Sequence, residues 1–561
     1  MANKIIVIHP GSRNLRIGRA SDLNPITILH AVGRKHRLES GLTSYQDGML
    51  PPLLEPNKEF EENRLQVAHS IQLQAYPKHA SKRSRISTPP QQISTFNRRS
   101  VPEELPLDKD HTVKLESTET IFDQTILSLT SSEAKEYNVH FPLRRGELNL
   151  HNGIGGSMSS VLENLEAIWL HVINDKMGIT PKLLSQYNAV LVIPDVYNRS
   201  HLREMVTLLL QRLRFASCFL LQDHVSATFG AGLGYACVVD LGDQKCSISC
   251  VEDAISQPDT RVRLAYGGAD VTQVFYTLLR KCSFPYKECK VENSYQDATL
   301  LTHLKERFCH LNFEICGAQE KTFNVQTAKH ILCYTIQLGD ECLVAPMSLF
   351  HTELLNITGK LKDVRTQLRS SQQPDAEDCF DAEYIRETGR RNGREGAMME
   401  GTMPTTGDVG EDDLVVVETF DVDTTIKNGE KEEQNFMING QIVSLDQAIV
   451  RSIERCGNDE MKRKMYGCIL IVGGGIKFGG FAKCLEQKVT LSMASYAQQR
   501  TPGVPQFEVN IVAKEMDAGM IAWKGAAIMS CLESAPELWI MPNEWEKYGL
   551  RVLREKAPFM W

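Results

Sequence analysis

Two short hairpins that contain glycine, about 230 residues apart, constrain the fold of this chain more than any other feature. The first is the apolar run Ile5–Ile8, a turn at Gly11, and a second run that ends at Gly18. The second is the apolar run Cys237–Val239, a turn at Gly242, and an alternating strand pattern. Glycine has no Cβ, so the N–H groups of such turns approach a phosphate closely. Two such hairpins facing each other predict a polyphosphate site between two halves of a fold.

Length, charge and cysteine content limit the class of protein. With 561 residues the chain has room for several domains with sizeable cores. Its net charge of −8 argues against nucleic-acid binding over the whole surface, so any basic contact must be local. None of the 15 cysteines forms a C-x-x-C pair, which fits a reducing compartment, the cytosol or the nucleus. No run approaches the roughly 18 apolar residues of a membrane span, so we expect no membrane partner.

A polar region with weak periodicity covers residues 34–118, and its residues 63–102 include no Asp or Glu. One interpretation is a solvated loop insertion. Another is an arm that contacts phosphates or an acidic surface, or a nuclear-import signal at 78–85, and both interpretations can hold together. The candidate basic residues are Lys78, Lys82, Arg83, Arg85, Arg98 and Arg99.

A second polar segment covers residues 371–435. Between Asp375 and Glu433 it contains 18 acidic and 6 basic residues. A segment of this composition buries too little apolar surface to order itself, so disorder is the expectation. Contact with basic histone surfaces is a functional alternative that charge alone supports only weakly.

The rest of the chain alternates between apolar residues at helical spacing and short buried-strand runs. This alternation predicts an α/β fold in which helices cover a sheet, and the second hairpin begins a matching half. The predicted elements are a helix over Val161–Ile173, a strand over Ala189–Ile193, a helix over His201–Leu213, a strand over Phe219–Leu221, a helix over Leu445–Arg455 and a strand over Cys468–Val472.

At these segments the chain resembles the actin-related protein family. The resemblance covers residues 1–20, about 155–365 and 440–561, with the two polar segments as insertions. It implies the bilobal α/β fold shared by actin, sugar kinases and chaperone ATPases, with two duplicated halves and large polar insertions. The lobes would be residues 1–235 and 236–561, the latter with a return segment at about 535–561. Besides the hairpins it rests on Gly267–Asp270, Leu304–Arg307, Gly473–Gly475 and Trp523–Ala527.

Longer segments, among them residues 220–234 (LLQDHVSATFGAGLG) and 538–545 (LWIMPNEW), resemble one nuclear subfamily. Its members are subunits of INO-type ATP-dependent chromatin remodellers. The resemblance implies a nuclear location and roles in transcription regulation, DNA repair, recombination and replication. The implied partners are the remodeller ATPase, nuclear actin, other actin-related proteins, core histones or nucleosomes, and linker DNA. The insertion after residue 30 replaces a region that actins use in filaments, so we expect no filament formation.

The resemblance also implies a site for ATP or ADP with Mg²⁺. In the first hairpin, the residues implied to contact phosphate are Gly11, Ser12 and Arg16. In the second hairpin, the residues implied to contact phosphate are Gly242 and Asp243. The turn near base and sugar contributes Gly268 and Asp270, the ribose and base contacts are Lys305 and Glu306, and the nucleotide packs over Gly473, Gly474 and Gly475. Asp240 would order the waters around Mg²⁺, and Gln222 would orient the attacking water.

Several positions depart from the actin pattern. A neutral imidazole at His9 replaces an aspartate of the Mg²⁺ water shell, which should weaken metal binding. Ser247 stands where actins carry a histidine, so half of the pair that positions water is missing. The actin lysine that packs against adenine falls near Gly519. We therefore expect nucleotide binding with slow or absent hydrolysis.

Three alternatives remain open from the sequence. The chain could be an autonomous slow ATPase with a regulatory nucleotide switch, or a cytoskeletal regulator in the cytoplasm. The hairpin glycines could also serve only a positive φ and close packing, without a nucleotide.

Overall fold

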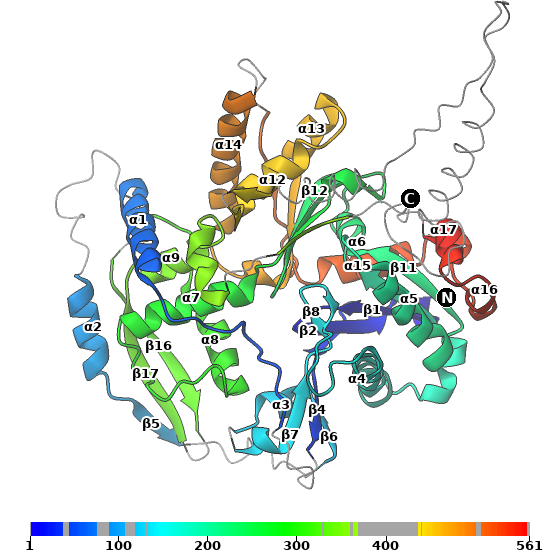
Figure 1. Ribbon diagram of the computed structural model, residues 1–561, viewed down its shortest axis with the longest axis horizontal. Coiled ribbons are helices and arrows are strands. Elements are labelled where there is room, and N and C mark those ends of the chain that lie inside the picture. Colours follow the sequence, from blue (N-terminus) through cyan, green and yellow to red (C-terminus); the bar gives the residue numbers. More distant parts are fainter. Residues whose placement is uncertain are drawn as a thin grey trace, which may run out of the picture.

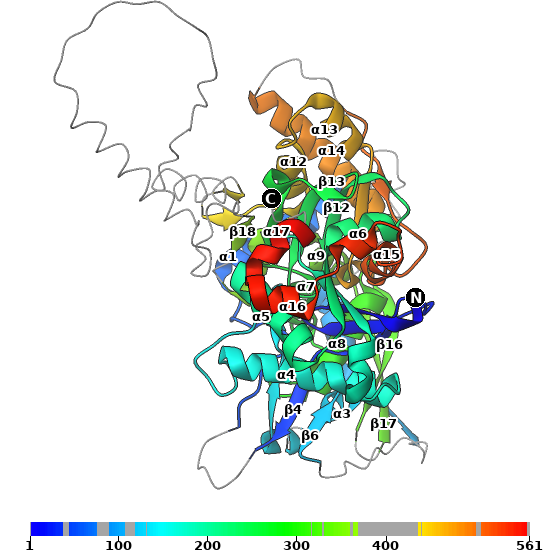
Figure 2. The same ribbon diagram turned by 90° about the vertical axis from the view of Figure 1, so that its right-hand side faces the viewer.

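The computed structural model describes residues 2–36, 44–75, 89–106, 118–130, 132–315, 317–327, 330–359, 363–367, 436–438, 440–500 and 507–557. Two mixed sheets form the centres of two halves, which lie on either side of the helices α6 and α15 (Figures 1 and 2). The basic candidates Lys78, Lys82, Arg83 and Arg85, and the acidic segment 371–435, lie outside the described residues.

The first sheet has the strand order β11-β10-β1-β2-β3. Strands β1, β10 and β11 run parallel, whereas β1, β2 and β3 form an antiparallel meander. Both strands predicted for this half, over 189–193 and 219–221, are confirmed as parts of β10 and β11. The bounds are β1 (Ile5–Pro10), β2 (Asn14–Arg19), β3 (Ile26–Leu29), β10 (Asn188–Ile193) and β11 (Ser217–Gln222).

The second sheet has the order β18-β15-β13-β12-β21-β22, and β14 (Ile255–Ser256) pairs with β13. Here too an antiparallel hairpin, β12–β13, lies beside a parallel strand, β21. The predicted duplication of an α/β half is therefore confirmed. The bounds are β12 (Tyr235–Leu241), β13 (Cys246–Glu252), β15 (Val262–Leu264), β18 (Val364–Thr366), β21 (Ile469–Val472) and β22 (Ile511–Val512).

Helices cover both sheets, and the predicted helices are present. The helix predicted over 201–213 is α5 (Arg199–Thr207) continued by a wider turn at Leu208–Arg212. The apolar faces of α4 and α5 pack into one core with the first sheet and with residues 540–557. The other helices are α4 (Met158–His171), α7 (Gly268–Lys281), α8 (Tyr295–Phe308), α9 (Glu341–Met347), α12 (Leu445–Ile453), α13 (Asp459–Tyr466), α14 (Phe481–Arg500), α16 (Pro542–Tyr548) and α17 (Leu553–Lys556). None of the helices in the described ranges is long and apolar enough to cross a membrane.

Helices α6 (Asp223–Gly230) and α15 (Ile521–Met529) connect the two halves and pack directly against each other. The chain passes from β11 to β12 through α6 and returns from β22 to the first sheet through α15. A Cβ at Gly230 would lie 2.1 Å from the Ile521 carbonyl oxygen, and one at Gly525 would lie 1.7 Å from that of Ser226. Only glycine at both positions allows the two backbones to approach this closely.

Part of the insertion at 34–118 is folded, so the interpretation as a solvated loop is wrong for that part. The chain leaves the small sheet β6-β4-β7, forms two helices and a strand against the second half, and then returns to the small sheet. Strand β5 extends the sheet β16-β17 by pairing antiparallel with β17. The lobe boundary at 235/236 stays a prediction. The bounds are β4 (Val32–Lys35), α1 (Lys58–Ala75), α2 (Pro90–Arg99), β5 (Glu103–Pro106), β6 (Thr120–Phe122), α3 (Gln124–Leu127), β7 (Tyr137–His140), β16 (Gln319–Gln326) and β17 (His330–Leu338).

The buried Asn97 makes three hydrogen bonds that help to fix α2 to the second half. The Asn97 side-chain amide donates to the carbonyls of Cys282 (2.8 Å) and Gln337 (2.9 Å) and accepts from the Gln337 N–H (2.8 Å). Ile93, one turn earlier, is also buried. Arg98 and Arg99 end the same helix with exposed side chains, and Arg98 donates to the Ser283 hydroxyl.

We expect Asn97→Ala to release α2, because the substitution leaves three backbone groups without their hydrogen-bond partner. The cost is roughly 2–4 kcal/mol for buried groups of this kind. Hydrogen–deuterium exchange over 90–106 should accelerate strongly in Asn97→Ala and not in the exposed control Gln92→Ala. Unchanged protection in Asn97→Ala would contradict the assignment.

Candidate functional site

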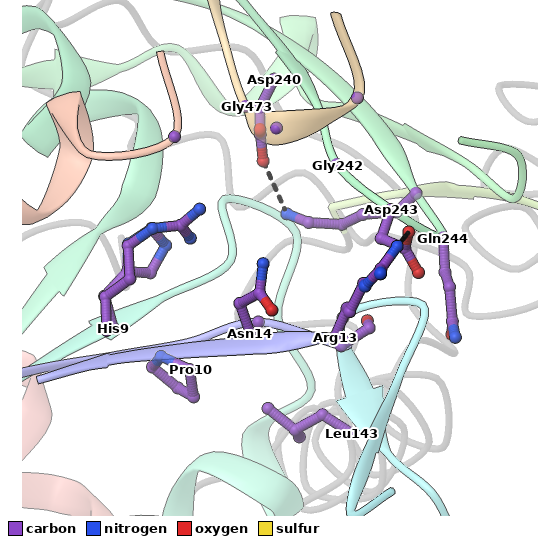
Figure 3. A pocket seen from close by; sticks show the side chains of 18 of the residues that line it. His9, Pro10, Arg13, Asn14, Leu143, Asp240, Gly242, Asp243, Gln244 and Gly473 are labelled. Carbon is purple, nitrogen blue, oxygen red and sulfur yellow. Dashed lines mark ion pairs between the residues drawn. The ribbon is translucent and has the colours of Figure 1, made fainter. Parts of the chain in front are cut away.

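The two predicted hairpin turns lie opposite each other across a cleft between the halves (Figure 3). They close in the same way: Gly11 N–H donates to the Asn14 carbonyl (3.0 Å), and Gly242 N–H donates to the Lys245 carbonyl (2.9 Å). A Cβ at Gly11 would lie 2.8 Å from the Asn14 carbonyl oxygen. Close packing therefore requires this glycine, whereas neither turn glycine has a positive φ.

A cavity of 430 Å³ lies between the turns, which is within the usual range for small-molecule sites. Most of the predicted site residues come together here. Two do not: neither Asp270 nor Gln222 lines the cavity. The predicted residues that line it are Gly11, Ser12, Arg16, Asp240, Gly242, Asp243, Gly268, Lys305, Glu306, Gly473, Gly474 and Gly475.

Three glycine-containing segments pack on one another beside the second hairpin. Gly473 has a φ of +98°, and a Cβ there would lie 2.3 Å from the Leu241 carbonyl oxygen. A Cβ on Gly475 would lie 2.6 Å from the Gly242 carbonyl oxygen. This layering brings the Gly473–Gly475 turn and the start of α7 to the cavity wall.

Cationic side chains converge on the cavity from both halves. Arg13 of the first hairpin lies 3.8 Å from the Asp243 carboxylate of the second. The Lys305 ammonium donates to the Gly268 carbonyl (2.8 Å), and burial lowers the pKa of Lys305 despite the nearby Asp243 and Glu306. Burial likewise lowers the pKa of Arg16, against Asp517 and Asp240. Partly desolvated cations of this kind favour an anionic ligand.

Asp270 has a structural contact instead of a ligand contact. Its carboxylate accepts from the Gly267 N–H (3.0 Å) and from the Thr358 hydroxyl (2.6 Å), and so caps the start of α7. An aspartate at the third position of a helix commonly satisfies the first free N–H groups in this way. The resemblance gave the right helix start but did not distinguish a cap from a ligand contact.

Gln222 is buried, and its amide nitrogen donates to the Asp195 carbonyl (3.2 Å). The prediction that it orients an attacking water has no support from its position outside the cavity lining.

An imidazole from another element contacts Ser247, the residue that stands where actins carry a histidine. His224, at the start of α6, hydrogen-bonds to the Ser247 hydroxyl through Nε2 (3.0 Å) and to the Ser249 hydroxyl through Nδ1 (2.7 Å). The departure from the actin pattern at Ser247 gave no indication of this imidazole. His224 nevertheless lies only two residues after Gln222, which the resemblance did identify.

The residues near the phosphate end do not fit a site for Mg²⁺. Burial and the Arg16 charge lower the pKa of His9 to about 3, so its imidazole is neutral. The Lys245 ammonium lies 2.9 Å from the Asp223 carboxylate and 3.5 Å from that of Asp240. The carboxylate predicted to order metal-bound water is thus paired with a cation of the protein.

The sequence did not single out several lining residues. Arg13 and Asn14 belong to the first turn, and Lys245 belongs to the second, so a systematic inspection of every turn side chain would have found them. Asp223 and Lys477 offered no comparable signal, because they reach the cavity only through the packing of α6 and of the segment after β21.

Comparison with known proteins defines the class. The family model described as Actin matches residues 2–558. The chain is 53% identical to actin-related protein 8 of Aedes aegypti, over 100% of this chain and 98% of the relative, and 50% identical to that of Drosophila melanogaster, over 100% and 95%. A solved structure, "Human actin-related protein Arp8 in its ATP-bound state", matches with a TM-score of 0.79 and 34% identity over 100% of this chain and 98% of the other.

The chain therefore belongs to the actin family, and within it to the actin-related protein 8 group.

Two buried histidines near the first hairpin give a pH prediction. The pKa of His9 is about 3 and that of His30 about 4, both lowered by burial. His30 Nδ1 donates to the Gly11 carbonyl (2.7 Å). Between about pH 6.5 and these values only the unfolded chain takes up protons, so stability falls as the pH falls, by about 1.4 kcal/mol per pH unit for each histidine.

Chemical denaturation between pH 6.5 and 5 should therefore show a shallower pH dependence in His9→Asn and in His30→Asn than in the parent chain. The exposed control His330→Asn should leave the slope unchanged. Equal slopes in all four proteins would contradict the burial of these imidazoles in the neutral form.

Proposed function

We propose that the chain is a nucleotide-binding, non-catalytic or weakly catalytic actin-related subunit of an INO-type ATP-dependent chromatin-remodelling complex. The observation that carries the nucleotide part is the cavity between the two glycine turns. Three cationic side chains line this cavity from both halves: Arg13, Arg16 and Lys305. A polyphosphate between the turns would find backbone N–H groups and charged donors together, which is the arrangement phosphate sites use.

ATP or ADP is the proposed ligand. The similar human structure is of a protein in its ATP-bound state. In this chain, Lys305 and Glu306 line the same cavity as the phosphate turns, at the positions that the resemblance gives to ribose and base contacts. A nucleotide lying from the turns to α8 would use both ends of the cavity.

Slow or absent hydrolysis is the second part of the proposal. Phosphoryl transfer depends on positioning and on charge stabilisation. The Gln222 amide nitrogen donates to the Asp195 carbonyl (3.2 Å), and Gln222 is not among the residues that line the cavity, which supports slow hydrolysis. His224 is the imidazole of the described residues that lies beside Ser247, and any measured turnover would be assigned to it first.

The chromatin part of the proposal rests on membership of the actin-related protein 8 group and on the sequence. The proposed location is the nucleus. The proposed partners are the remodeller ATPase, nuclear actin, other actin-related proteins, core histones or nucleosomes, and linker DNA. The exposed Arg98 and Arg99 are candidates for phosphate contact. The folded insertion against the second half supports the absence of filaments, because it covers surface of that half.

Nucleotide binding predicts a specific pattern of affinities. Arg16→Met and Lys305→Met should each weaken ATP binding roughly ten- to a hundredfold in calorimetric titration, since each removes a charge-assisted contact. Lys464→Met, outside the cavity and paired with Glu252 at 3.0 Å, is the matched control.

Phosphate release should stay far below about 1 s⁻¹, the lower end of ordinary enzyme turnover. Turnover at or above that rate, abolished by His224→Asn, would instead favour the autonomous ATPase.

Chromatin binding is tested with reconstituted nucleosomes across a salt series. Saturable binding is expected, and the slope of log K against log salt should become shallower by roughly 0.9 for each phosphate that the double variant Arg98→Ala/Arg99→Ala no longer neutralises. An unchanged slope would remove these arginines from the DNA contact. The absence of any binding would leave only an assembly role.

A further inference from the structure

One ammonium group lies between two carboxylates at the phosphate end of the cavity. Lys245 Nζ is 2.9 Å from Asp223 Oδ2, 3.5 Å from Asp240 Oδ2 and 3.3 Å from the Ser247 hydroxyl. The side chains of Lys245, Asp223 and Asp240 are 13%, 8% and 18% exposed. The cluster is thus an internal feature of the cleft, and all three charged residues line the cavity.

Three separate elements hold the cluster in place. Asp240 lies near the end of β12, Lys245 closes the following turn with its carbonyl, and Asp223 begins α6. Burial alone would lower the pKa of Lys245, but the Asp223 and Asp240 carboxylates raise it above its ordinary value. The two carboxylates therefore favour the charged form of Lys245.

A divalent cation would have to compete with this group for the same carboxylates. Mg²⁺ needs near-octahedral oxygen ligands and keeps several waters, so it needs both space and negative charge. The ammonium already lies between Asp223 and Asp240, and His9 adds no charge on the opposite side. The carboxylates that would otherwise order a metal are therefore paired with a cation of the protein.

Lys245 also lines the cavity that the ligand would occupy. Two of its three N–H groups are directed to Asp223 and to the Ser247 hydroxyl. Asp240 Oδ2 lies 3.5 Å from the same ammonium, so a phosphate oxygen in the cavity would compete with Asp240 for the third N–H, and Arg13 and Arg16 lie on the facing hairpin. An ammonium is well suited to this role as a compact point charge.

We propose that Lys245 takes the place of a divalent cation, so that the cleft binds ATP or ADP in its metal-free form. This inference rests on the proposed nucleotide-binding function and specifies the ligand of that site. It also explains why the aspartate of the actin pattern is dispensable at His9: no metal-bound water needs to be ordered there.

The first test is calorimetric titration of the full chain, freed of nucleotide, with ATP in EDTA and then at increasing Mg²⁺. ATP should bind in EDTA, and the apparent Kd should rise in proportion to the ATP that Mg²⁺ has complexed. Loss of binding in EDTA, or a Kd that does not depend on Mg²⁺, would overturn the inference while leaving nucleotide binding intact. The absence of ATP binding in both buffers would refute the proposed function and the inference together.

The second test uses variants of the cluster. Lys245→Met should weaken ATP binding in EDTA roughly ten- to a hundredfold, and Mg²⁺ should restore part of the affinity because both carboxylates become available. The double variant Lys245→Met/Asp223→Asn removes one charge of each sign, and so avoids leaving the more buried of the two carboxylates unpaired in case the single variant misfolds. Lys464→Met is the control. Unchanged affinity in EDTA for the folded single or double variant would overturn the role of Lys245.

Discussion

The close crossing of α6 and α15 is the contact on which the arrangement of the molecule depends. The two sheets are joined through these helices, and Gly230 and Gly525 let their backbones meet without intervening side chains. Trp523 of α15 is fully buried against the first sheet and donates its indole N–H to the Val7 carbonyl (3.0 Å), while Ile521 packs against the second sheet. One short helix therefore sets the distance between the halves, and with it the distance between the two glycine turns.

The insertion adds a second connection between the halves. It begins and ends in the small sheet β6-β4-β7, but its helices and β5 belong to the second half. The residues before α1 add to this connection: Tyr295 of α8 donates to the Asp47 carbonyl (3.0 Å), and Gln273 of α7 donates to the Pro51 carbonyl. Gln296 of α8 also donates to the carbonyl of Ser128, which follows α3. Movement of the halves about the α6–α15 crossing would have to break these contacts.

The duplicated hairpins were predictable from the sequence because glycine placement and alternating apolar residues are local properties of the backbone. The folded part of the insertion was not, because α1 and α2 are polar over most of their surface and order by docking: Phe60, Ile71 and Ile93 are buried only against the second half. In the site, the sequence was sufficient to predict that the glycine turns and Lys305 line the cavity. It was not sufficient for Asp270 and Gln222, because Asp270 bonds to Thr358 and Gln222 bonds to Asp195, and both partners are distant in sequence. The ion pair between Lys245 and Asp223 was not predicted for the same reason. Asp223 precedes Lys245 by 22 residues, and the two side chains lie together because α6 packs beside the hairpin.

The central claim is that a protein cation occupies the metal position in a nucleotide cleft. A crystal structure of the chain with ATP and Mn²⁺, with anomalous data collected at the manganese edge, tests it most directly. We expect phosphates between the turns at Gly11 and Gly242, Lys245 Nζ within hydrogen-bond distance of a phosphate oxygen, and no manganese peak between Asp223 and Asp240. A manganese peak at that position, with the Lys245 side chain displaced from both carboxylates, would contradict the claim.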